Sequence, residues 1–159
     1  MFCTYVRPIL EYSSVCWSPC LVRDIVKVES VQRRFTKRIP GLHHYSYSER
    51  LRLLGLVSLE MRRLRADLIE VFKIIHGVDK LRFGEFFQLC GTNTRGHAFK
   101  LYPIKFRCNV RKHFFTNRVI TVWNALSDVL VEASSIDEFK LKLLSIDLNK
   151  YLVVRDHVT

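Results

Sequence analysis

Long apolar runs are missing from this chain of 159 residues, because charged residues interrupt every hydrophobic stretch within a few positions. A helix needs about 20 consecutive apolar residues to cross a bilayer. The start of the chain also lacks the basic region followed by an apolar region that marks a secretory signal peptide. We therefore expect no membrane span, and we expect an intracellular protein of the nucleus or the cytoplasm.

A cysteine pattern typical of disulfide-bonded proteins is also missing. The five cysteines are odd in number and irregularly spaced, at Cys3, Cys16, Cys20, Cys90 and Cys108. Reduced thiols in an intracellular protein fit this pattern best. An alternative is a zinc site made of Cys90, His97, Cys108 and His113, but six, ten and four residues separate these positions, which matches neither a finger nor a knuckle. We expect no metal and no cofactor.

The motifs of common enzyme classes are absent. The chain has no glycine-rich phosphate loop, no nucleophile elbow and no His-Glu-x-x-His helix. Its seven aspartates are never adjacent, whereas a two-metal centre needs clustered carboxylates. The six histidines are scattered and give no reason to choose a nucleophile and base pair. We expect no catalytic residue, no small-molecule substrate and no enzymatic activity in the isolated chain.

Acidic residues are scarce, and one long segment has none. The chain has 26 Lys and Arg against 15 Asp and Glu, a net charge of +11, and both halves are basic. Between Phe86 and Ser127 there is no carboxylate, and we call this stretch the acid-free segment. Its seven basic residues are Arg95, Lys100, Lys105, Arg107, Arg111, Lys112 and Arg118. Aromatic residues lie among them at Phe99, Tyr102, Phe106, Phe114, Phe115 and Trp123.

This mixture predicts contact with the backbone of an RNA or DNA strand. Cations neutralise phosphates, while aromatic rings stack on bases. The competing interpretation is that the basic surface only balances an acidic neighbouring domain. A secondary basic cluster, made of Arg33, Arg34, Lys37 and Arg38, lies at the end of a predicted helix. There the cations either cap the helix dipole or contact phosphate.

Apolar periodicity predicts a mainly α fold in a single domain. Helices are expected over residues 9–17, 21–39, 47–54, 61–75 and 110–126, with a last helix from residue 136, and a short helical turn within residues 84–89. Two capping boxes, Ser46 with Glu49 and Ser135 with Glu138, predict helix starts. Gly55 and Gly77 predict helix ends. We expect the domain to span residues 1–152 and residues 153–159 to be a frayed tail.

Two local features complete the expected fold. Around residues 97–107 apolar and other side chains alternate, which predicts a small β-hairpin. Arg62, Arg63 and Arg65 lie near the positive end of the 61–75 helix, so they are expected to have an anionic partner. The partner is either Glu60 or a phosphate, and the local carboxylate is favoured.

Five sequence segments together resemble a known family. They are YVRPILEY at residues 5–12, VQRRF at 31–35, LGLVSLE at 54–60, TRGH at 94–97 and RVITVWN at 118–124. Their order and spacing resemble the C-terminal thumb and post-thumb region of LINE-type, non-LTR retrotransposon reverse transcriptases, over roughly residues 2–145. The resemblance implies that the fingers, the palm with its paired catalytic aspartates and the endonuclease lie upstream of Met1.

The resemblance implies a truncated, non-catalytic remnant of an RNA-directed DNA polymerase that contacts RNA or DNA backbone and, where present, the upstream palm domain. Some relatives end in a cysteine-histidine knuckle, which this sequence lacks. The alternative function is a helical protein-interaction module in which the apolar stripe from Leu21 to Ile39 docks on a partner helix, with no nucleic-acid role.

Overall fold

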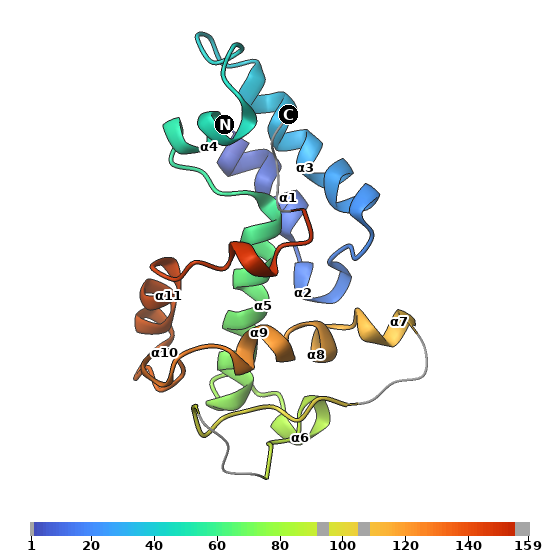
Figure 1. The fold of residues 1–159 in the computed structure, drawn as a ribbon, viewed down its shortest axis with the longest axis vertical. Coiled ribbons are helices and arrows are strands. Elements are labelled where there is room, and N and C mark those ends of the chain that lie inside the picture. Colours follow the sequence, from blue (N-terminus) through green and yellow to red (C-terminus); the bar gives the residue numbers. More distant parts are fainter. Residues whose placement is uncertain (1, 92–95, 105–108, 155–159) are drawn as a thin grey trace. The chain divides into compact units, whose positions relative to one another are not determined.

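The computed structural model describes residues 2–91, 96–104 and 109–154, apart from the side chains of Asn109 and Val110. These residues form helices joined by turns, which confirms the prediction of a mainly α fold (Figure 1). No strand occurs within the described ranges, where Leu89 and Leu101 form an isolated antiparallel bridge. None of the described helices is both long and apolar enough to cross a membrane.

The hairpin predicted around residues 97–107 is not seen in the described residues, and residues 105–108 lie outside them. The extended backbone at Leu101 instead bonds to groups distant in sequence. Cys90 N donates to Lys100 O at 2.8 Å, and Tyr102 N donates to Gln88 O at 2.7 Å. The Asn124 side chain bonds both the N and the O of Leu101, each at 2.8 Å. The first two bonds belong to the Leu89–Leu101 bridge, and Asn124 satisfies the N and O of Leu101, which a further strand would otherwise bond.

The chain divides into two compact units, and the single domain expected over residues 1–152 stays a prediction. Unit 1 comprises residues 1–64 and 148–159, and unit 2 comprises residues 65–147. The division falls inside helix α5 (Leu59–Ile75). Each unit buries apolar side chains of its own, such as Ile25 in unit 1 and Phe139 in unit 2.

Unit 1 is built on helices near both ends of the chain. In order they are η1 (Phe2–Val6), α1 (Arg7–Glu11), α2 (Ser14–Trp17), α3 (Val22–Lys37), α4 (Tyr47–Leu53), the start of α5 and η2 (Asn149–Tyr151). The single helix predicted over residues 9–17 is divided at Ser13, which has a left-handed backbone with φ of 51°. Phe2 stacks on Phe35 of α3 with ring centroids 4.8 Å apart, and Ile25 of α3 is buried.

The predicted start and end of α4 are both confirmed. Ser46 Oγ accepts from Glu49 N at 3.3 Å, and the Glu49 carboxylate accepts from Ser46 N at 2.9 Å. This reciprocal pair is the expected capping box. The chain leaves the helix through Gly55, whose φ of 61° favours glycine.

Unit 2 contains the remainder of α5 and a series of shorter helices. They are α6 (Phe83–Phe86), α7 (Asn109–Lys112), α8 (Phe115–Arg118), α9 (Ile120–Asn124), α10 (Asp128–Val131) and α11 (Ile136–Leu144). Phe139 lies between Phe72 and Trp123, with centroid distances of 4.4 Å and 6.1 Å. These three side chains are buried and form the centre of the unit.

The helix predicted over residues 110–126 is wrong as a continuous element. The chain instead forms α7, α8 and α9, and Phe114 has an extended backbone with ψ of 148° between the first two. The pattern of core residues still holds, because Phe115, Val119, Val122 and Trp123 are buried. Helical spacing therefore identified the buried face, whereas the break at Phe114 had no signal in the apolar pattern.

The remaining predicted helix signals are largely confirmed. α5 ends before Gly77, whose φ is 63°. Ser135 Oγ accepts from Glu138 N at 3.2 Å and so caps α11, as expected. The second half of that capping box differs, because the Glu138 carboxylate accepts from Ser134 N and Ser134 Oγ, at 2.8 Å and 2.6 Å. The predicted start of the helix is correct, and its reciprocal contact is displaced by one residue.

The first residues of the predicted tail are bonded to unit 1. Val153 N donates to Glu60 Oε1 at 2.6 Å, and Val154 N donates to Glu60 Oε2 at 3.4 Å. Glu60 therefore holds the chain after Leu152, where the sequence predicted fraying. Residues 155–159 lie outside the described residues.

Candidate nucleic-acid interface

The structure gives the seven cations of the acid-free segment different surroundings. Arg95, Lys105 and Arg107 lie outside the described residues. Lys100 is half-buried, and its side chain folds over Gly96. A Cβ at Gly96 would lie 3.0 Å from Lys100 Cε and 3.1 Å from Lys100 Nζ. Lys100 is therefore packed against its own loop.

Arg118 is committed to the fold of unit 2. Its Nε and Nη2 donate to the two carboxylate oxygens of Asp67, each at 2.8 Å. Arg118 Nη1 also donates to His113 O at 3.2 Å. The Asp67 side chain is 5% exposed and that of Arg118 is 19% exposed, so the pair is largely shielded from water. A guanidinium held in this two-pronged way is a structural cation with little freedom to contact a phosphate.

Arg111 and Lys112 are exposed on α7. Within the described part of the chain, neither side chain is joined to a carboxylate. The backbone beneath them is fixed, because Asn117 Nδ2 donates to Arg111 O at 2.6 Å. Phe114 follows two residues later with its side chain 61% exposed. We call Arg111, Lys112 and Phe114 the 111–114 surface.

Loop residues 96–104, which precede this surface in the sequence, are attached to α9 by side chains of the RVITVWN segment. Trp123 Nε1 donates to Phe99 O at 2.9 Å, and His97 Nε2 bonds Trp123 O at 3.1 Å. Asn124 bonds both backbone groups of Leu101. Several residues of the segments that carry the family resemblance therefore bind the fold of unit 2 together.

The secondary basic cluster lies at the C-terminal end of α3 in unit 1. Arg34, Lys37 and Arg38 are exposed. Arg33 differs, because its guanidinium lies over the Tyr47 ring, 5.0 Å from the centroid. Cations at the C-terminal end of a helix stabilise it by complementing its dipole. The three exposed cations can therefore stabilise α3, or they can contact a phosphate.

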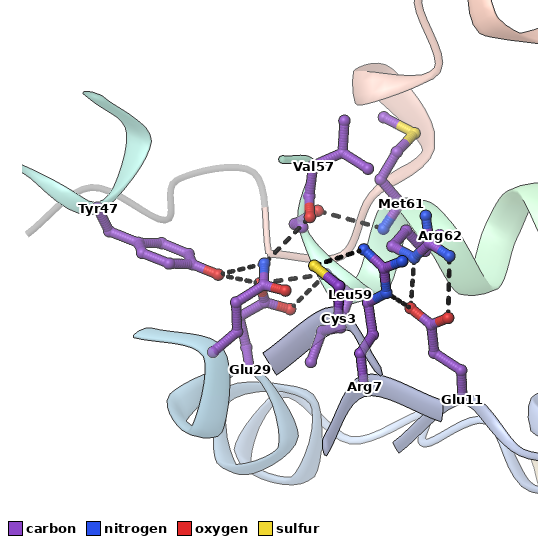
Figure 2. Close-up of polar contacts among 11 residues, drawn as sticks. Cys3, Arg7, Glu11, Glu29, Tyr47, Val57, Leu59, Met61 and Arg62 are labelled. Atoms are coloured by element: carbon purple, nitrogen blue, oxygen red, sulfur yellow. Dashed lines mark hydrogen bonds and ion pairs between the residues drawn. The ribbon is translucent and has the colours of Figure 1, made fainter. Parts of the chain in front are cut away.

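A buried polar network in unit 1 has no counterpart in the sequence predictions (Figure 2). Glu29 is fully buried and accepts from Tyr47 Oη at 2.5 Å and from Leu59 N at 3.0 Å. Gln32, also fully buried, donates through Nε2 to Tyr47 Oη and Val57 O, each at 3.0 Å. In the sequence Gln32 only interrupts an apolar stripe. The single available signal was that two polar residues lie on the apolar face of one helix.

This network caps the first turn of α5. The Glu29 carboxylate lies at the N-terminal end of the helix, where free N–H groups and the dipole favour an anion. Burial raises the pKa of the Tyr47 phenol, and the Glu29 charge raises it further. The phenol therefore stays protonated and donates a hydrogen bond to the Glu29 carboxylate. The bonds of Glu29, Gln32 and Tyr47 join α3 to α4 and to the backbone of Val57 and Leu59, which gives the network a structural role.

Arg62 has a partner, but it is not the predicted one. Its guanidinium donates to both oxygens of Glu11, with Nη2 to Oε2 at 3.0 Å (Figure 2). This hydrogen bonding raises the pKa of Arg62 above its usual value. Glu60, the favoured candidate, instead accepts from Val153 N and Val154 N. The pair links α5 to α1, across 51 residues of sequence.

The described residues contain no group of three or more His, Cys, Asp or Glu side chains that would suit a metal ion. Of the four residues considered for zinc, Cys108 lies outside the described residues. His97 is buried, and its Nε2 is bonded to Trp123 O.

Comparisons of the chain with models of protein families, with curated proteins and with solved structures gave no match. The candidate interface therefore depends on the chemistry of its own residues. In the described chain that interface is the 111–114 surface.

Proposed function

We propose that this chain is a non-catalytic relative of the thumb and post-thumb region of LINE-type reverse transcriptases and that it binds RNA or DNA backbone. The observation that carries the binding proposal is the pair of exposed cations, Arg111 and Lys112, in a segment without carboxylates. Exposed cations that are free of acidic partners release counterions when they contact phosphate, which favours binding. Arg118 supports the same surface by holding its backbone.

The remainder of the proposal follows the family resemblance. It places the chain in the nucleus or cytoplasm, without a cofactor or a small-molecule substrate. The palm domain of a parent protein is its proposed protein partner. Trp123, Asn124 and His97 belong to two of the resembling segments, and their bonds join these segments in unit 2.

A salt titration with charge-reversal variants tests the binding proposal. If about four cations contact a single strand, the logarithm of the affinity should fall against the logarithm of the salt concentration with a slope near −3. The double variant R111E/K112E should reduce that slope by about one to two units, because each lost phosphate contact removes most of one released counterion. Binding to RNA and DNA oligonucleotides would be measured by fluorescence anisotropy.

The matched control is K140E/K142E on α11. Lys140 pairs with Asp137 at 3.0 Å and Lys142 pairs with Glu138 at 2.7 Å, so these cations are already balanced. This variant changes the net charge by the same amount and should have a much smaller effect. Equal losses from both variants would mean that only total charge matters. An affinity that changes neither with salt nor in either variant would contradict the nucleic-acid proposal.

The second candidate function is protein interaction, and the surface of unit 1 favours it. Three large apolar residues recur there at helical spacing: Tyr5 in η1, Ile9 in α1 and Tyr12 directly after α1. They are 68%, 75% and 80% exposed. The predicted docking stripe of α3 is less available, because Ile25 is buried and Phe35 stacks on Phe2. Large apolar side chains that are exposed together are typical of a surface that a binding partner covers.

Self-association tests this candidate. The purified chain should form oligomers or bind a hydrophobic dye, and the variant Y5S/I9S/Y12S should reduce both effects. A matched control is L141S/L144S, which removes two exposed apolar side chains from α11. A monomeric wild-type chain with a cooperative melt and no dye binding would contradict the protein-interaction candidate.

A further inference from the structure

The 111–114 surface combines two exposed cations with one exposed aromatic ring, and the ring is the unexplained part. Its neighbour Phe115 is buried and packs against Phe87 with centroids 5.7 Å apart. The Phe114 ring has no aromatic partner within the described residues. A single exposed apolar side chain is ordinary on a protein surface. What distinguishes this ring is its position two residues after a pair of cations that have no acidic partner in the described part of the chain.

The surface is held in place before any ligand binds. The backbone is extended at Phe114, which lies between α7 and α8. Arg118 connects His113 O, immediately before Phe114, to the Asp67 carboxylate on α5. Asn117 fixes the backbone of Arg111 from the other side of the break. Prior fixing of the backbone lowers the entropy that is lost when a ligand binds.

We propose that Phe114 stacks on an unpaired base while Arg111 and Lys112 contact the adjacent phosphates, so that the 111–114 surface selects single-stranded over duplex nucleic acid. This inference rests on the proposed nucleic-acid function. An exposed ring can stack on a base only when the face of that base is free, and in a duplex both faces are covered by neighbouring bases. Phosphates are present in both forms and are denser in the duplex, so the cations alone would give no preference for the single strand.

The charge of the surface selects this occupant over an apolar protein segment. A protein surface that docked on Phe114 would bury Arg111 and Lys112 beside it, and burying unpaired cations is costly. A nucleic-acid strand supplies an anion for each cation and a flat apolar face for the ring. Stacking of a base on an aromatic side chain contributes about 1–3 kcal/mol, which corresponds to a change in affinity of about fivefold or more.

The test compares strands that have the same phosphates but differ in their bases. The probes are oligothymidylate and oligouridylate of roughly 12 nucleotides, the matching duplex, and an abasic strand of equal length. The wild-type chain should bind either base-containing strand about fivefold or more tightly than the duplex or the abasic strand. Phe114→Leu should remove this advantage and leave duplex and abasic binding unchanged, whereas Phe114→Trp should retain it.

The control for loss of an exposed ring is Tyr5→Leu in unit 1, which should alter none of these affinities. Circular dichroism and melting temperature of each variant establish that it is folded. Salt-dependent binding that is equal for strand, duplex and abasic probe and indifferent to Phe114→Leu would overturn the stacking role, while the proposed function would stand. Failure of every probe to bind would overturn both proposals.

Discussion

Arg118 and Asp67 lie 51 residues apart in the sequence and form a two-pronged ion pair, with both N–O distances at 2.8 Å. The pair takes one of the seven cations of the acid-free segment away from ligand binding. It also supports the 111–114 surface, because Arg118 bonds His113 O as well. The Arg118 contacts therefore stabilise unit 2 and make this one cation unavailable to a nucleic-acid strand.

Asp67→Asn is expected to destabilise unit 2 by about 3 kcal/mol. The substitution leaves the shielded Arg118 charge without its anion, and removing one partner of a buried pair is costly. The control, Asp137→Asn, removes the exposed partner of Lys140 and should cost less than about 0.5 kcal/mol. Urea unfolding followed by circular dichroism would measure both. Similar values for the two variants would show that the Arg118 pair contributes no more than a surface contact.

Glu138 is expected to make the stability of the fold dependent on acid. Hydrogen bonds from Lys142 and then from Ser134 lower the pKa of its carboxyl from 4.5 to about 2. Because the pKa is lower in the folded state, this group stabilises the fold above its unfolded pKa, and the contribution is lost as the pH falls from about 5 towards 2.

Melting temperatures of Glu138→Gln and wild type should therefore differ near pH 7 and converge as the pH approaches about 2. Glu132→Gln is the control, since Glu132 is exposed and its carboxylate has no bonded partner within the described residues. Its difference from wild type should be small at every pH. A Glu138→Gln deficit that stays constant down to acid pH would contradict the assigned role of this carboxylate.

Glu29→Gln is expected to lower the free energy of unfolding by about 2 kcal/mol. Tyr47 Oη and Leu59 N both donate to the Glu29 carboxylate, so an amide NH₂ placed there would face a donor. Tyr47→Phe should cost about 1 kcal/mol, because it removes the hydrogen bonds of Tyr47 Oη to Glu29 and Gln32 but leaves Glu29 bonded to Leu59 and Gln32 bonded to Val57. The midpoint of urea unfolding would rank the two variants. A neutral Glu29→Gln would mean that the cap of α5 does not need the charge.

No template-directed DNA synthesis is expected from the purified chain with magnesium or manganese. The buried carboxylates of the described chain have structural partners: Glu29 bonds Leu59, Glu60 bonds Val153, and Asp67 bonds Arg118. Polymerase chemistry needs neighbouring carboxylates that hold two metal ions. Primer extension above a no-protein control, abolished by Asp67→Asn or another aspartate substitution, would overturn this expectation.

Local chemistry in the sequence determined where several helices begin and end. Ser46 and Glu49 predicted the start of α4, and Gly55 and Gly77 predicted ends that the structure confirms. These signals work because a cap is made by residues within one turn of each other. The apolar pattern also identified Trp123 as a buried residue before any fold was known.

Contacts between distant residues were beyond the reach of the sequence patterns. The predicted hairpin was replaced by bonds from Asn124 to Leu101, and the expected partner of Arg62 was replaced by Glu11. Gln32 read as an interruption of a stripe, although it is part of a buried network. Each of these bonds depends on which segments meet in space, and a polar residue forms the bond that burial makes available.

The acid-free segment shows most clearly the difference between what the sequence determined and what the tertiary structure decided. Its composition by itself determined that the segment is basic and interleaved with aromatic residues, and it predicted the kind of ligand. Only the tertiary structure decided that Arg118 faces Asp67 while Arg111, Lys112 and Phe114 face solvent. The physical reason is that net charge is a property of composition, whereas the availability of each charge depends on the partner that the fold brings to it.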